Sequence, residues 1–156
     1  MQLHFYEVKF KGLVEDYQLS EEQLYFTGMP MDCIKQSIKD PDRYSVLTIE
    51  EEKLVTFFDL HKNEGAKPYS KNTNSILLRA FSTDFRHQGK GYAKNALTLL
   101  PDFVKEHFRE MNEIVLAVNV RNEAAQVLYK KCGFIDEGAR KIGMKGEQIV
   151  MSYYIK

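Results

Sequence analysis

The sequence predicts a single domain of the α/β (α+β) class, in which helices pack on one mixed sheet. Its 156 residues, of which 44% are hydrophobic and 28% are charged, can bury one core but not two. Segments with the two-residue period of strands alternate with segments of helical period. In the middle of the chain a strand, a glycine-rich turn, a helix and a second strand follow in order, which predicts a right-handed crossover with a parallel pair of strands at its centre. We therefore expect one domain over residues 1–156.

The N-terminal part is predicted to contain one strand and two helices. Residues 3–10 have the pattern of a strand. Residues 20–26 suit a short helix that begins with Ser20 as its N-cap and has acidic residues behind it. Residues 31–40 carry apolar side chains at helical spacing and end before Pro41.

Three strands are predicted next. Residues 43–50 and 53–61 have strand composition and are joined by Glu51 and Glu52, which we interpret as the solvated turn of a hairpin. After a polar loop, residues 75–81 form an apolar run that suits a strand buried on both faces.

A long amphipathic helix is predicted directly after the glycine-rich turn. Its apolar residues recur at steps of three and four, and they are Ala93, Ala96, Leu97, Leu100 and Val104. Pro101 should kink or locally break this helix, because proline lacks an amide donor and crowds the carbonyl four residues earlier. The remaining elements are a buried strand over 113–120, a short helix within 122–134, and closing strands at 138–143 and 147–155.

The charge balance and composition exclude several classes of partner. The 22 Lys and Arg residues equal the 22 Asp and Glu residues, so we expect no general attraction to nucleic acid or to an anionic membrane. The first residues carry neither a basic leader nor a secretory apolar run, and no segment suits a membrane span, so we expect a cytoplasmic protein. Cys33 and Cys132 have no second ligand at metal-binding spacing, and we expect reduced thiols and no metal site.

Residues 86–97, RHQGKGYAKNAL, place two glycines one residue apart just before the long helix. Amides in such a turn point outward together, and the helix dipole adds about half a positive charge, so a phosphate or pyrophosphate is the usual ligand. A Walker loop would need Ser or Thr at Gly91, and a dinucleotide fingerprint would need a small residue at Lys94. A third design, Gln/Arg-x-x-Gly-x-Gly/Ala, is filled in order by Gln88, Gly91 and Ala93.

A second informative stretch is NEAAQVLYKKCGF, residues 122–134. Asn122 suits a helix N-cap and Gly133 suits a helix end in the left-handed conformation. The face that points to the sheet is formed by Ala125, Leu128, Tyr129 and Cys132. Taken without the glycine loop, Tyr129 would be interpreted as a core tyrosine with a hydrogen-bonded hydroxyl.

With both stretches in this order, each after a strand, the sequence resembles the GNAT superfamily of N-acetyltransferases. The resemblance covers about residues 45–156 in the order of elements, and its specific motifs lie between residues 80 and 134. It implies the acyl-CoA N-acyltransferase fold, with a mostly antiparallel sheet of six to seven strands and about four helices. It also implies that the parallel pair splays apart at the cofactor site, and that acetyl-CoA is the co-substrate.

The resemblance further implies roles for individual residues. The pyrophosphate would be bound by the six-residue turn, which consists of Gln88, Gly89, Lys90, Gly91, Tyr92 and Ala93. The pantetheine arm and the thioester carbonyl would meet the backbone of the strand end formed by Ala80, Phe81 and Ser82. Asn122 would contact the cofactor, and Tyr129 would be the catalytic residue that protonates the departing thiolate.

No motif predicts a general base. Many members of this superfamily place a glutamate on the strand before the second helix, where this sequence has Ala117. Four other titratable residues are candidates only because they can titrate, and no motif assigns a role to any of them: His61, Asp84, His87 and Glu113. The acceptor amine would then lose its proton to water, or react from its small neutral fraction.

The acceptor itself is not identified by the sequence. The resemblance implies that residues 25–30 and the tyrosines of residues 152–154 contribute to its site, and that the acceptor is a primary amine of a small molecule, a polyamine or a peptide N-terminus. Glu21 and Glu22 would suit a polyamine, although Lys residues are interspersed with the acids. A homodimer stays open as the oligomeric state. Two other functions stay open: a non-catalytic acyl-CoA-binding module or sensor, and an enzyme that binds another nucleotide through the glycine loop.

Overall fold

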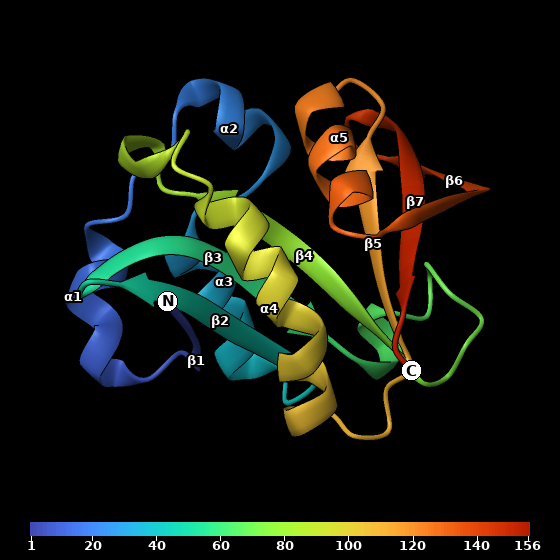
Figure 1. Ribbon diagram of the computed structural model, residues 1–156, viewed down its shortest axis with the longest axis horizontal. Helices are drawn as coiled ribbons and strands as arrows, with labels where there is room; N and C mark the ends of the chain where they lie inside the picture. Colours follow the sequence, from blue (N-terminus) through green and yellow to red (C-terminus); the bar gives the residue numbers. More distant parts are fainter.

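The computed structural model describes all residues, 1–156, and contains one seven-stranded sheet with helices on both faces (Figure 1). The elements of the first half are β1 (Gln2–Phe5), the 3-10 turn η1 (Val8–Phe10), α1 (Lys11–Glu15), α2 (Glu21–Phe26), α3 (Pro30–Lys39), β2 (Arg43–Glu50) and β3 (Lys53–His61). The elements of the second half are η2 (Asn63–Gly65), β4 (Ser75–Thr83), η3 (Phe85–His87), α4 (Tyr92–His107), β5 (Glu113–Asn119), α5 (Glu123–Lys131), β6 (Ile135–Gly143) and β7 (Gly146–Tyr154).

The strands are ordered β1-β2-β3-β4-β5-β7-β6, and every neighbouring pair is antiparallel except β4 and β5. The parallel pairing covers only Ser75 to Leu77 of β4 against Glu113 to Val115 of β5. Beyond that point the two strands diverge, toward the end of the molecule where α2 and α5 lie (Figure 1). The predicted mixed, mostly antiparallel sheet with a splayed parallel pair is confirmed.

Two apolar layers cover the two faces of the sheet. On one face α4 and α5 pack through residues such as Leu97, Leu100 and Tyr129 against side chains of β2 to β5 and β7. On the other face α1 and α3 pack through Val14 and Ile34 against β2 and β3. The domain is therefore built of three layers, with the sheet in the middle.

The strand and helix predictions are confirmed over most of the chain. The hairpin strands β2 and β3 have the predicted bounds, and Glu51 and Glu52 form their exposed turn with φ of 50° and 67°. Ser20 caps α2 in a capping box with Gln23. The strand predicted over residues 3–10 is shorter than expected, because β1 ends at Phe5. The chain then turns through η1 into the short helix α1, which the sequence did not predict.

The helix α4 is continuous from Tyr92 to His107, so of the two effects expected at Pro101, a kink or a local break, the break does not occur. Proline removes one hydrogen bond from the helix. The buried residues on both sides of Pro101, which include Leu97, Leu100 and Val104, hold the two halves of the helix against the same core. Tertiary packing thus outweighs the local cost of the proline.

Both cysteines are free thiols, with Cys33 buried and Cys132 half-buried, as expected. Burial raises the pKa of each thiol above its ordinary value. None of the helices combines the length and the apolar character that a membrane crossing requires.

Candidate functional site

Two adjoining pockets open where β4 and β5 diverge. The larger, of about 1140 Å³, is lined by α2, by β4 from Leu78 to Ser82, by β5 from Leu116 to Asn119, and by the turn between β6 and β7. The smaller, of about 300 Å³, lies between the end of β4, the glycine-rich turn and α5. Six residues line both pockets and so mark where they join: Phe81, Ser82, Gln88, Asn122, Ala124 and Tyr129.

The glycine-rich turn presents a row of free backbone donors. Gly89 and Gly91 have φ of 79° and 82°, in the left-handed region that favours glycine. The backbone amides of residues 88–94 donate no hydrogen bond to another group of the protein, and no side chain caps α4. A helix N-terminus with uncapped amides and a partial positive charge suits an anionic ligand.

The six predicted residues of this turn differ in their position relative to the pockets. Gln88 lines both pockets, and Gly89, Tyr92 and Ala93 line the smaller one. Lys90 and Gly91 line neither pocket and are exposed, with Gly91 as the N-cap position of α4. A ligand that occupies the smaller pocket therefore reaches the free amides by extending over the turn.

The end of β4 contains a bulge at the point where its edge becomes free. Phe57 of β3 faces Ser82 and Asp59 faces Arg79, so one residue of β3 is opposite two residues of β4, Ala80 and Phe81. Ala80 adopts φ of 56°, which an L-residue other than glycine rarely adopts. Because β5 has already diverged, backbone groups of this segment are available to a ligand in the larger pocket.

Tyr129 lies at the junction of the two pockets. Its ring is buried against Phe81 and Phe134, with centroid distances of 6.3 Å and 5.9 Å. The hydroxyl makes no hydrogen bond with the protein, unlike that of Tyr17, which is bonded to Ser82. Burial raises the pKa of Tyr129 above its ordinary value, with a smaller contribution from Cys132, so the hydroxyl keeps its proton and can donate it. The ring of Tyr129 is thus part of the core, but its hydroxyl has no hydrogen-bond partner in the protein, unlike the hydroxyl of an ordinary core tyrosine.

The capping role of Asn122 is confirmed, because its side chain accepts a hydrogen bond from the amide of Ala125 at 3.3 Å. Asn122 also lines both pockets, on the side opposite the glycine-rich turn. The predicted site residues 80–82, Asn122 and Tyr129 thus surround one continuous space, although they come from two separate elements, β4 and the capped helix α5.

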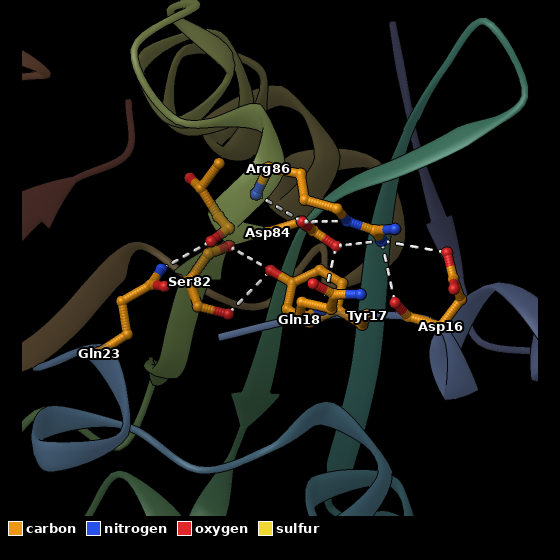
Figure 2. Close-up of polar contacts among 8 residues, drawn as sticks. Asp16, Tyr17, Gln18, Gln23, Ser82, Asp84 and Arg86 are labelled. Atoms are coloured by element: carbon orange, nitrogen blue, oxygen red, sulfur yellow. Dashed lines mark hydrogen bonds and ion pairs between the residues drawn. The ribbon is translucent and has the colours of Figure 1, made fainter. Parts of the chain in front are cut away.

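A hydrogen-bond network that the sequence did not reveal fixes the end of β4 (Figure 2). The Tyr17 hydroxyl lies 2.9 Å from both the carbonyl oxygen and the Oγ of Ser82. Gln23 of α2 donates to the carbonyl of Thr83 at 2.7 Å. These contacts join residues 60 or more positions apart, so no local sequence pattern could have indicated them.

Asp84 continues this network toward the glycine-rich turn (Figure 2). It is fully buried and accepts hydrogen bonds from the Arg86 guanidinium, at 2.8 Å and 3.1 Å, and from the amides of Arg86 and Gln18. Burial alone would raise the pKa of Asp84, but these hydrogen bonds outweigh it and hold the pKa below its usual value. Asp84 is therefore an ionised structural residue.

The other titratable residues considered as bases are mostly remote from the pockets. His61 pairs with Asp40 at 2.9 Å, and Glu113 is buried with Ser70 and Ser152, at the end of the sheet where β4 and β5 are still paired. His87 lines the smaller pocket. Ala117 lines the larger pocket, so the position without a carboxylate does face the site.

The outer wall of the larger pocket joins α2 to the opposite half of the sheet. Tyr25 of α2 accepts a hydrogen bond from Arg121 at 3.1 Å, and the Lys145 ammonium lies 4.0 Å from the centroid of its ring. Of residues 25–30, which were expected at the acceptor site, residues 25–28 line this pocket and Met29 and Pro30 do not, and Tyr25 is exposed. The tyrosines of residues 152–154 do not line it, because Tyr153 packs on Phe134 and Tyr154 bonds Glu137.

No group of three or more His, Cys, Asp or Glu side chains is arranged to hold a metal ion. The polar features of the site are instead backbone amides, the Tyr129 hydroxyl and the charged side chains of the larger pocket.

The chain matches a family model and a known bacterial protein over most of its length. The model of the acetyltransferase (GNAT) family matches residues 10–134, which extends the likeness further toward the N-terminus than the sequence motifs did. A protein of Bacillus subtilis (strain 168), named as the uncharacterized N-acetyltransferase YbbJ, is 38% identical over 154 residues, covering 98% of this chain and 96% of its own.

Solved structures share the fold at lower sequence identity. The spermidine N-acetyltransferase from Vibrio cholerae, solved with CoA and spermine, has a TM-score of 0.73 and 17% identity, with 98% of this chain and 94% of that chain covered. The aminoglycoside acetyltransferase AAC(6')-Ib, solved with coenzyme A and kanamycin, has a TM-score of 0.79 and 11% identity, with the same coverage of both chains.

Proposed function

Because the chain belongs to the acetyltransferase (GNAT) family, we propose that it transfers the acetyl group of acetyl-CoA to a primary amine by direct attack. The acceptor is an amine of a small molecule, a polyamine or a peptide N-terminus. The observation that carries the proposal is the row of free amides at residues 88–94, which adjoins the pockets where β4 and β5 diverge and where Tyr129 lies.

Each of the two pockets binds one of the two proposed substrates, acetyl-CoA or the amine. The turn from Gln88 to Ala93 binds the pyrophosphate of acetyl-CoA through its amides, and Asn122 contacts the arm that enters the smaller pocket. The backbone of Ala80, Phe81 and Ser82, at the edge that β5 leaves unpaired, pairs with the pantetheine arm and polarises the thioester carbonyl, while the carbonyl of Ser82 stays bonded to Tyr17. The larger pocket, on the other side of this strand end, receives the amine.

The transfer needs one bond to form and one to break. The neutral amine attacks the thioester carbonyl carbon, the carbon–sulfur bond breaks, and one proton passes in net terms from the nitrogen to the sulfur. Backbone amides of the β4 bulge stabilise the negative charge that develops on the carbonyl oxygen. Tyr129 donates its hydroxyl proton to the leaving sulfur. This role is supported by the position of its hydroxyl, which lies at the junction of the pockets and makes no hydrogen bond with the protein.

A coupled thiol-release assay over a panel of amines tests the proposal. We expect thiol release from acetyl-CoA that depends on the amine, and stabilisation of the fold in thermal unfolding by acetyl-CoA but not by ATP or NAD. A second candidate is a non-catalytic acyl-CoA-binding module, which Ala117 in the larger pocket favours. Stabilisation by acetyl-CoA without thiol release for any amine would support that module, and stabilisation by ATP or NAD alone would contradict both.

The glycine-rich turn can be tested separately with Gly91→Val. No protein atom lies within 4 Å of a Cβ at this position, so the added side chain does not disrupt the core. It does oppose the left-handed backbone, at a cost of about 1–2 kcal/mol, and it crowds the proposed pyrophosphate. We expect acetyl-CoA to bind about tenfold more weakly or worse in calorimetric titration.

Gly12→Val is the matched control, because Gly12 also has no atom within 4 Å of a Cβ but lies in α1, outside both pockets and without positive φ. Unchanged acetyl-CoA affinity in Gly91→Val would contradict the assignment of the loop.

A further inference from the structure

The larger pocket contains an arginine without a carboxylate partner. Arg79 lies on β4, immediately before the bulge at Ala80, and lines this pocket in an exposed position. It takes part in none of the ion pairs of the protein, whereas Arg43, Arg86 and Arg140 each pair with an aspartate. Because a guanidinium stays charged at all ordinary pH values, the pocket carries an unneutralised positive charge beside the proposed thioester site.

The nearest aspartate is already used. Asp59 faces Arg79 directly in the register of β3 and β4, but it accepts hydrogen bonds from Arg43 at 2.5 Å and from Ser45 at 2.8 Å. Although Arg79 keeps much of its surface exposed, partial removal of its guanidinium from water, followed by repulsion from Arg43, lowers the pKa of Arg79 from its usual value. The Arg43–Asp59 pair is thus a neutral unit, and the charge of Arg79 is left for a ligand.

His61 contacts the Arg79 guanidinium and links it to Asp40. Nη1 of Arg79 lies 3.4 Å from Nδ1 of His61, and Nε2 of His61 lies 2.9 Å from Oδ2 of Asp40. Arginine can only donate, so Nδ1 is the acceptor and the ring carries its proton on Nε2, which donates to Asp40. His61, which the sequence offered only as an unassigned titratable residue, is therefore a positioning residue for Arg79.

The opposite wall adds two more cations. Lys141 of β6 and Lys145 of the following turn line the same pocket, over the rings of Tyr69 and Tyr25. The acids of the pocket, Glu21 and Glu22, lie in the first turn of α2, where the helix dipole stabilises them without any ligand. Three cations against two acids leave a positive excess in a pocket of a protein whose formal net charge is zero.

We propose that Arg79 binds a carboxylate of the acceptor, so that the acceptor is a small amine that also carries a carboxylate, such as an amino acid. The inference rests on the proposed transferase function. Arg79 lines the same pocket as Ala80, Phe81 and Ser82, and it precedes them in β4 by one to three residues. An amine at the thioester and a carboxylate at Arg79 can thus belong to one small molecule. The planar guanidinium matches a carboxylate in a bidentate manner, and it repels a polyamine.

The test uses amino acids, each paired with its own carboxamide, and spermidine as a cationic comparator. Binding to the complex of the protein with CoA is measured by calorimetry, and turnover is measured by thiol release. We expect each preferred amino acid to bind about tenfold or more tightly than its amide. Arg79→Gln should abolish this preference, mainly through KM, and leave the amide and acetyl-CoA unaffected. Arg79→Lys should retain part of the preference for the carboxylate, because lysine keeps the positive charge but lacks the bidentate geometry of the guanidinium.

Arg140→Gln is the control, because Arg140 is an exposed arginine paired with Asp136 and lies outside the pocket. Thermal unfolding verifies that each variant is folded. If no amino acid binds more tightly than its amide, or if spermidine is the best ligand and Arg79→Gln improves it, the carboxylate site is overturned. Binding of carboxylates that depends on Arg79 but lacks thiol release would leave this site standing and refute the transferase. Thiol release without any preference for carboxylates would support the transferase function and refute the carboxylate site.

Discussion

Replacing Tyr129 with Phe should lower kcat by about 100-fold or more and leave the affinity for acetyl-CoA nearly unchanged. The variant removes only the hydroxyl, which makes no hydrogen bond within the protein and lies at the junction of the two pockets. The leaving sulfur would then depart as a thiolate without a donor beside it. Steady-state kinetics at saturating acceptor and calorimetric titration with acetyl-CoA measure the two quantities.

The packing of Tyr129 makes this variant a clean test. The ring contacts Phe81 and Phe134, and phenylalanine can keep both contacts. Tyr153 is the matched control, because it packs on the same Phe134, at 5.7 Å, but lines neither pocket. If Tyr129→Phe retains activity within twofold of the wild type, or if Tyr153→Phe loses as much, Tyr129 is a packing residue and not the proton donor.

The glycine-rich turn could be predicted from the sequence because its requirements are local. Gly89 and Gly91 adopt positive φ, which glycine provides at no steric cost, and the apolar spacing of α4 begins directly after them. The cap of α5 by Asn122 is equally local. Each of these features depends on residues that are only a few positions apart, so the local amino-acid sequence is sufficient to predict them.

The shape of the acceptor side could not be predicted in this way. Ala80 adopts positive φ because the pairing of β3 with β4 leaves Ala80 and Phe81 opposite a single residue, and nothing in the residue type indicates a bulge there. The hydroxyl of Tyr17 meets Ser82 across 65 positions of sequence. The residue type of Arg79 does not set it apart from other strand residues, and its lack of a partner follows only from the way Arg43 occupies Asp59.

The errors in the fold have the same origin. Residues 3–10 have strand periodicity throughout, but β1 ends at Phe5 and the chain departs into η1 and α1. The helix α1 is five residues long and contains Gly12, so its sequence has little helical signal, and its buried Val14 belongs to the core on that face of the sheet. Tertiary contacts decided the structure at this place and at Pro101, and those contacts are made by residues distant in the sequence.

Deprotonation of the acceptor is the step for which the site offers no assigned residue. Ala117 faces the larger pocket without a carboxylate, Asp84 is an ionised structural residue held by Arg86, and His61 and Glu113 are bonded elsewhere. An alkylammonium with a reference pKa near 10.4 is neutral in only about one molecule in a few thousand at pH 7. We therefore propose that the amine reacts from this neutral fraction or passes its proton to water.

For an alkylamine acceptor, kcat/KM should then rise by about one decade per pH unit from neutral to alkaline pH, a gain of about 1000-fold over three units, without levelling off near pH 7. Tyr129 does not limit this rise, because burial raises its pKa and keeps the hydroxyl protonated over the whole range. An acceptor with a reference pKa of about 8, such as an α-amino group, should level off earlier, near its own pKa. The measurement is a pH profile of kcat/KM for the two acceptors with acetyl-CoA saturating.

The comparison between the two acceptors separates the amine from the protein. If the profiles level off at different pH values that follow the two amines, the titrating group belongs to the substrate. If both level off at the same pH near 7, a base of the protein takes the proton and the proposal is wrong. His87 is then the first residue to replace, because it lines the smaller pocket, whereas His61 is held between Asp40 and Arg79 outside both pockets. In that case His87→Gln should abolish the shared plateau while His61→Gln leaves it in place.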